Sequence, residues 1–230
     1  MAKEFYDISY KAYFNTRLKE VVFQGVETWP LYVQVTYDRK SVFFKSYYFG
    51  LFSQPKYDFL KMPLWHVIEL EHKAIEFLIA WNADGFSLGR LQQQYKMHSQ
   101  DLLDSLDRPF KKWLAGYFRE QGLPGLSALM EHEPDRVAAI RLWDDLAKCL
   151  DADVFARLEM KVTRGEAPPY IHLAMYVRDK LPKGPFCLPL YEWSDDDTKR
   201  AIGRSIESRL WRADIGRIEM IVRGLLRSKG

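Results

Sequence analysis

Two histidines and a glutamate in the first third of the chain, His66, Glu69 and His72, have the side chains that could bind a metal. Imidazole and carboxylate groups are common zinc ligands. In a helix, however, residues six positions apart are separated by about 120° around the axis, so these two histidines do not converge as histidines four apart would. The spacing favours a structural use, and we predict no metal centre and no cofactor.

Acidic residues could also hold a divalent cation in a nuclease-type site. The group Asp144, Asp145, Asp151 and Asp153 is more typical of a solvated helix face, and the acids at 195–197 suit the first turn of a helix. The motifs GxxxxGK[ST], GxGxxG, HExxH and GxSxG do not occur in the sequence. We therefore favour a non-enzymatic protein, and an enzyme of an unfamiliar family is a third hypothesis.

Basic and aromatic side chains are interleaved between positions 39 and 49. The predicted phosphate contacts are Arg39, Lys40 and Lys45, and the predicted aromatic contacts are Tyr47, Tyr48 and Phe49. A basic β-surface that bears aromatic rings can contact phosphates and stack bases. Aromatic residues are also ordinary strand formers, so packing into the core is the alternative interpretation.

A second basic group lies near the C-terminus. Its predicted nucleic-acid contacts are Arg200, Arg204, Arg209 and Arg212. Residues 198–230 hold nine Lys/Arg against three Asp/Glu, whereas residues 62–197 hold sixteen against twenty-two. Arginine forks fit both phosphate and carboxylate. The arginines could therefore bind nucleic acid, pair with the acidic middle of the chain, or join copies in a homo-oligomer.

The run from Trp29 to Phe44, WPLYVQVTYDRKSVFF, contains an LYV-x-V-T-x-x-x-K strand, a tight turn and a second strand. It resembles the arm-type DNA-binding region at the start of phage and conjugative-transposon tyrosine recombinases. The resemblance implies a DNA-binding role for this hairpin. Recombinase catalysis would also require a His-x-x-Arg motif, and none of the five histidines is followed by arginine at the third position. The resemblance therefore implies no recombinase activity.

Hydrophobic periodicity places these residues on elements. Residues 31–35 alternate as in a half-buried strand, and residues 41–49 form a second β-rich run, so we predict a hairpin across 30–49. Residues 5–14 could add a third strand, and a short helix over 15–22 is an open alternative. Helical patterns and breakers predict helices over 64–81, 87–95, 99–121, 135–150, 152–162, 170–181, 194–210 and 214–227, with Ser99 as an N-cap.

The predicted fold class is α+β, mostly α, with an N-terminal β-hairpin or small sheet followed by a multi-helix body. We divide the chain into a hairpin region (1–60), a helical body (61–182), a Pro-rich linker (183–193) and basic C-terminal helices (194–230). The two cysteines lack metal or disulfide spacing, and the sequence shows neither a membrane-spanning apolar run nor a signal peptide. We expect a cytoplasmic protein without membrane association.

The favoured function is a non-enzymatic nucleic-acid-binding or regulatory protein of a mobile element or its host. The alternative is an interaction subunit that binds a protein partner through the aromatic hairpin and the opposed charge patches. These hypotheses differ in their dependence on salt, because phosphate contacts weaken steeply as salt is added and an aromatic interface does not.

Overall fold

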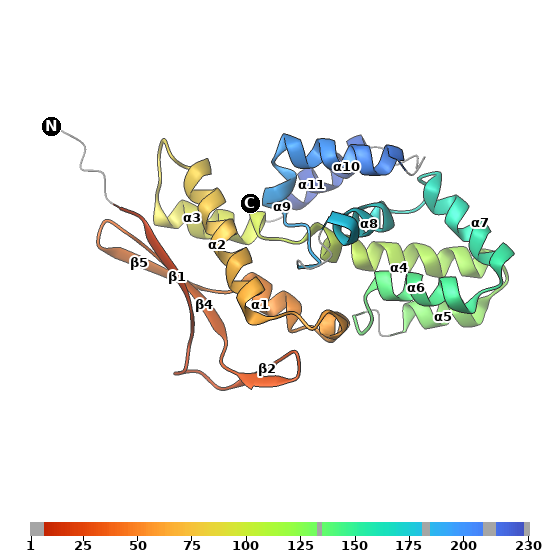
Figure 1. Ribbon diagram of the computed structural model, residues 1–230, viewed down its shortest axis with the longest axis horizontal. Coiled ribbons are helices and arrows are strands. Elements are labelled where there is room, and N and C mark those ends of the chain that lie inside the picture. The colour runs from red at the N-terminus through yellow and green to blue at the C-terminus, as the bar shows by residue number, and fades with distance from the viewer. Residues whose placement is uncertain (1–6, 133–134, 181–184, 209–214, 228–230) are drawn as a thin grey trace. The chain divides into compact units, whose positions relative to one another are not determined.

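The computed structural model describes residues 7–132, 135–180, 185–208 and 215–227. The chain divides into two compact units, residues 1–99 and residues 100–230. The first unit contains all of the β-strands of the described residues, and the second unit is built from helices (Figure 1). The predicted α+β, mostly α fold is confirmed.

A three-stranded antiparallel sheet organises the first unit. Its strands are β1 (Ser9–Phe14), β4 (Leu31–Tyr37) and β5 (Lys40–Lys45), in the order β1-β4-β5. Alternate residues of the central strand, Leu31, Val33 and Val35, are fully buried, as the period-two pattern predicts. The hairpin over β4 and β5 is confirmed, and β1 supplies the third strand that the sequence left open.

Two helices cover one face of this sheet. Helix α2 (Leu64–Trp81) packs on β1, and α3 (Leu88–His98) packs on β4 and β5 (Figure 1). The bounds of α2 match the predicted helix over 64–81. Phe44 points to this covered face, where its ring lies 4.3 Å from the ring of Tyr95 on α3.

The second predicted strand, over 41–49, is wrong in its last part. Strand β5 ends at Lys45, and Tyr47–Phe52 form helix α1. Ser46 causes the change because its side chain accepts a hydrogen bond from the amide of Phe49 and caps the helix. Aromatic residues have only a weak preference for strands, so a cap and tertiary partners can override it.

A small second hairpin joins β1 to β4. Its strands are β2 (Val21–Phe23) and β3 (Val26–Thr28). The alternative helix over 15–22 is wrong, because residues 15–20 form a turn and a loop before β2 begins. The turn residue Gln24 has a positive φ of 52°, and its side-chain nitrogen donates to the carbonyls of Phe52 and Tyr57. These contacts hold the hairpin on α1 and on the 3₁₀ helix η1 (Pro55–Leu60).

The second unit begins with three packed helices. They are α4 (Leu102–Glu120), α5 (Pro124–Glu131) and α6 (Ala139–Cys149), and α5 and α6 both pack on α4 (Figure 1). The prediction that Ser99 is the N-cap of this first helix is wrong. Asp101 caps α4 instead, since its carboxylate accepts from the amides of Leu103 and Asp104. A carboxylate is favourable at the positive end of the helix dipole.

Four of the five remaining described helices of the second unit lie on predicted ranges, whereas the helix Leu190–Trp193 lies inside the predicted linker. The five helices are α7 (Ala152–Thr163), α8 (Tyr170–Lys180), α9 (Leu190–Trp193), α10 (Asp196–Ser208) and α11 (Ile215–Arg227). Of the predicted linker over 183–193, residues 183–184 lie outside the described residues, and residues 185–193 lie against the start of α4. Leu188 and Leu190 are buried, and the amide of Leu188 donates to the Asp101 carboxylate at 2.7 Å.

Candidate nucleic-acid interface

The sheet of the first unit has one face that α2 and α3 do not cover. In antiparallel strands, residues paired across the ladder lie on the same face, so the register identifies this set. We call these residues the open face: Ser9, Lys11 and Tyr13 on β1, Tyr32, Gln34 and Thr36 on β4, and Ser41, Phe43 and Lys45 on β5. All nine are exposed or half-buried. The set contains two lysines and no carboxylate.

Three aromatic rings belong to the open face. Phe43 is 51% exposed, although it is one of the more apolar side chains of the unit. The rings of Tyr13 and Tyr32 lie 6.4 Å apart on neighbouring strands, and the Lys11 ammonium lies 5.8 Å from the Tyr13 ring. Cations and rings are therefore neighbours on one surface, an arrangement that suits phosphates and bases together.

Polar groups occupy the middle of the open face. The side-chain nitrogen of Gln34 donates to the hydroxyl of Ser41 at 3.3 Å and lies 3.5 Å from the hydroxyl of Thr36. The hydroxyls of Thr36 and Ser41 are 2.7 Å apart. This network holds the Gln34 amide in place beside Lys11 and Phe43, its two register partners.

The turn between β4 and β5 brings two further cations to the edge of the sheet: Arg39 in the turn itself, and Lys40, which pairs with Tyr37 and so belongs to the covered face. The central residues of the turn, Asp38 and Arg39, both have positive φ, 50° and 59°, as in a type I′ hairpin turn. Arg39 and Lys40 are exposed, as is Lys45 at the other end of β5. Within the described residues, none of these three basic side chains makes a hydrogen bond or ion pair. The predicted phosphate contacts Arg39, Lys40 and Lys45 are thus accessible in the structure.

The predicted aromatic contacts lie elsewhere. Tyr48 and Phe49 are 0% and 3% exposed in helix α1, so the expectation that they form an aromatic surface is wrong. Tyr47 is half-buried with its ring against that of Tyr48, 5.2 Å between centroids. The aromatic rings of the open face come from Tyr13, Tyr32 and Phe43.

A buried carboxylate explains why residues 47–49 turn away from the sheet surface. Glu71 of α2 is 0% exposed and accepts hydrogen bonds from the Ser46 hydroxyl at 2.5 Å and the Tyr48 amide at 3.1 Å. Its other oxygen accepts from the Tyr95 hydroxyl at 2.5 Å. Burial raises the pKa of Glu71 from 4.5 to about 7, although these hydrogen bonds oppose the shift. In the sequence, Glu71 is one more acid on an amphipathic helix, and nothing there distinguishes it from the exposed acids.

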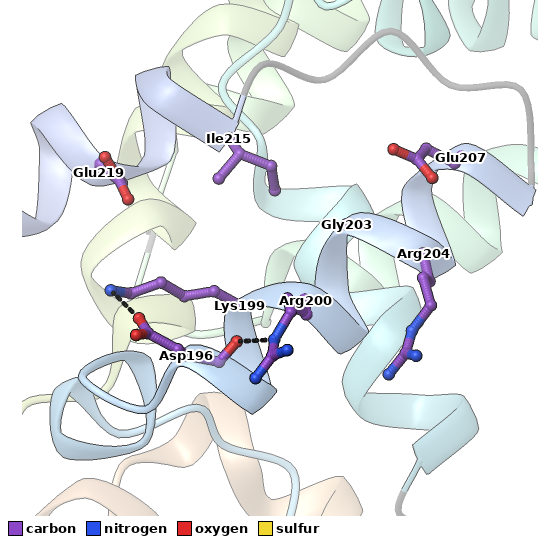
Figure 2. Close-up of a pocket in the computed structure, with 8 residues that line it drawn as sticks. All are labelled: Asp196, Lys199, Arg200, Gly203, Arg204, Glu207, Ile215 and Glu219. Atoms are coloured by element: carbon purple, nitrogen blue, oxygen red, sulfur yellow. Dashed lines mark hydrogen bonds and ion pairs between the residues drawn. The ribbon is translucent and has the colours of Figure 1, made fainter.

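Two of the predicted C-terminal contacts, Arg200 and Arg204, lie on α10, beside a groove of about 790 Å³ between α10 and α11 (Figure 2). Arg200 pairs with Asp197 at 2.6 Å, and Lys199 pairs with Asp196 at 3.2 Å. Arg204 is exposed and makes no hydrogen bond or ion pair within the described residues. The predicted contacts Arg209 and Arg212 lie outside the described residues.

The formal charges of the residues that line this groove cancel. Its lining contains the cations Lys199, Arg200 and Arg204, and it contains equally many carboxylates, Asp196, Glu207 and Glu219. On α11, Arg217 donates to the carbonyls of Gly165 and Ala167 at 2.7 and 3.1 Å. Most of these basic groups are thus held by protein acceptors, which matches the structural alternative considered from the sequence.

The histidines that prompted the metal hypothesis make aromatic contacts. The ring of His66 lies 3.5 Å from that of Trp65, and the ring of His72 lies 5.4 Å from that of Tyr10. Among the described residues, no three His, Cys, Asp or Glu side chains are arranged to hold a metal ion. Within the same part of the chain, no helix combines the length and apolar character needed to cross a membrane.

Comparison with known proteins gives no match to a family model, a curated protein or a solved structure. The resemblance of residues 29–44 to arm-type DNA-binding regions stays a prediction.

Proposed function

We propose that the chain binds nucleic acid through the open face and the adjoining β4–β5 turn. The observation that carries this proposal is the uncovered sheet face itself, on which lysines and aromatic rings lie side by side without a carboxylate among them. Nucleic-acid affinity comes largely from phosphate neutralisation, so a surface with cations and no competing acids is suited to it. The charge-balanced groove on α10 is less suited.

The conformation of Arg39 supports the same proposal. A side chain with a Cβ is strained at positive φ, and glycine is the usual second residue of this turn type. Gln24, which also has positive φ, is held there by hydrogen bonds from its side chain to protein carbonyls. Arg39 has no such partner in the described part of the chain. The Arg39 guanidinium is therefore available to a partner outside the protein.

Binding of short labelled oligonucleotides to the purified full chain, followed by fluorescence anisotropy at two salt concentrations, tests the proposal. We expect affinity to fall with added salt, and to fall further in the double variant Lys11→Ala/Lys45→Ala. The matched control is Lys148→Ala, which removes a lysine whose side chain is 74% exposed on α6 of the other unit. Equal affinity of both variants, or no binding at low salt, would count against the proposal.

The C-terminal arginines remain a second proposed contact, through Arg204. Its side chain is free within the described residues, whereas Arg200 is engaged by Asp197. In the same assay, Arg204→Ala should weaken binding more than Arg200→Ala. Absence of nucleic-acid binding in all of these experiments would favour the alternative of a protein partner.

A further inference from the structure

A hollow of about 210 Å³ lies on the open face. Four of its lining residues, Ser9, Lys11, Gln34 and Thr36, belong to the open face, and Tyr10 of β1 completes the lining. Pockets for drug-sized ligands usually span roughly 300–1,000 Å³, so this hollow suits one smaller group. Its hydroxyl, amide and ammonium groups are donors and acceptors of the kind that read the edge of a nucleobase.

Gln34 is placed to read such a group. Its side-chain nitrogen is directed by the hydroxyls of Thr36 and Ser41, at 3.5 and 3.3 Å. Its carbonyl oxygen accepts no hydrogen bond within the described residues. An amide that is already oriented loses little side-chain entropy on binding, because the protein has fixed its rotamer beforehand.

Phe43 and Lys11 flank Gln34 on the two neighbouring strands. Side chains opposite each other on one sheet face have Cβ atoms about 4.5–5.5 Å apart, so the three form a continuous row. The exposed Phe43 ring can stack on a second base, and the Lys11 ammonium borders the hollow, where a phosphate can approach it. Across β1, β4 and β5, the row therefore places the Lys11 cation, the hollow beside Gln34 and the Phe43 ring next to one another.

Resting on the function proposed above, we propose that the open face binds single-stranded nucleic acid, with one unpaired base in the hollow beside Gln34 and a neighbouring base on Phe43. In a duplex the bases are stacked on each other, so neither insertion into a hollow nor stacking on a protein ring is open to them. Single-stranded segments present both the faces and the edges of their bases. The charge of the open face, two lysines with no carboxylate, complements the phosphates of such a strand.

The test compares the full chain with four homopolymeric single strands and with a duplex of equal length, in DNA and RNA form, by anisotropy. We expect single strands to bind more tightly than the duplex. Phe43→Ala should weaken single-strand binding about 5- to 150-fold, the effect expected for one stacked base. The control Trp65→Ala removes a ring that is 61% exposed on α2, outside the open face, and should leave affinity unchanged.

Gln34→Ala should reduce the differences in affinity among the four homopolymers, because the oriented amide distinguishes base edges. Phe43→Leu, which keeps an apolar side chain without the ring, should weaken binding like Phe43→Ala while leaving the circular dichroism spectrum unchanged. Duplex binding as tight as single-strand binding, with Phe43→Ala and Gln34→Ala unaffected, would overturn this inference and leave the proposed function intact. Binding to neither form would overturn both.

Discussion

The variants Arg39→Gly and Arg39→Ala together separate two properties of Arg39: the strain of its backbone conformation and the use of its cationic side chain. Arg39 has a φ of 59° and makes no hydrogen bond within the described residues. Left-handed φ costs a residue with a Cβ about 1–2 kcal/mol, and glycine loses about 0.5–1 kcal/mol more backbone entropy on folding. Arg39→Gly should therefore stabilise the first unit by up to about 1.5 kcal/mol, and by about 0.75 kcal/mol at the centres of the two ranges. Arg39→Ala keeps the strain and should not stabilise it.

The same two variants should be alike in nucleic-acid binding. Both remove one cation, so the slope of log K against log salt should become shallower by about 0.7–0.9 for each phosphate that the protein no longer neutralises. Chemical unfolding measures the stability, and anisotropy over a salt series measures the slope. Equal stability of Arg39→Gly and Arg39→Ala would refute the strain argument, and an unchanged slope would refute the pairing of Arg39 with a phosphate.

Three further predictions concern buried polar groups. In the folded state the pKa of Glu71 is raised from 4.5 to about 7, so the folded state binds the proton more tightly than the unfolded state. The free energy of unfolding should therefore fall as pH rises from about 4.5 to 7. Glu71→Gln should flatten this pH dependence in unfolding curves taken across that range. Asp101→Ala should destabilise the second unit by about 2–4 kcal/mol, because it removes the cap of α4 and the acceptor of the Leu188 amide. A loss of under about 0.5 kcal/mol in thermal unfolding would contradict this role of Asp101. Lys111 and Asp107 form a buried ion pair at 2.5 Å. Lys111→Met alone should lower the free energy of unfolding by about 3–5 kcal/mol, because it leaves the Asp107 carboxylate buried without its cation. The double variant Lys111→Met/Asp107→Leu should recover part of that stability in denaturant titrations.

Helix α2 shows what the sequence predicts well. Its apolar residues recur at helical spacing, Pro63 suits the position before it, and the structure places it over the predicted range. Residues 47–49 show what it does not predict. Their aromatic side chains favour a strand locally, but the partner that fixes them in a helix, Glu71, lies more than twenty positions further along the chain. A single-sequence pattern contains no information on that contact.

Only part of the candidate site could be predicted from the sequence, because some of its residues are brought together by strand pairing. The charges of Arg39, Lys40 and Lys45 are evident in the sequence, and solvation keeps such groups at the surface. The aromatic members depend on strand parity: Phe43 shares its face with Lys45, whereas Phe44 faces α3. That parity was available from the alternation of β4 and β5. The contribution of Tyr13 required the pairing of β1 with β4, which the sequence left open.

The Glu71 contact also bears on the tendency of the hairpin segment to aggregate. The segment Val42–Phe49, VFFKSYYF, has high β-propensity and a single charge, the composition that favours cross-β stacking between chains. Ser46 and Glu71 interrupt it by starting a helix in its middle, so that only its first half can extend a sheet. A fragment that ends before Glu71 lacks this restraint, and we expect it to aggregate more readily than the full chain. The Glu71 carboxylate, on helix α2, thus keeps the second half of this aggregation-prone segment out of β-structure.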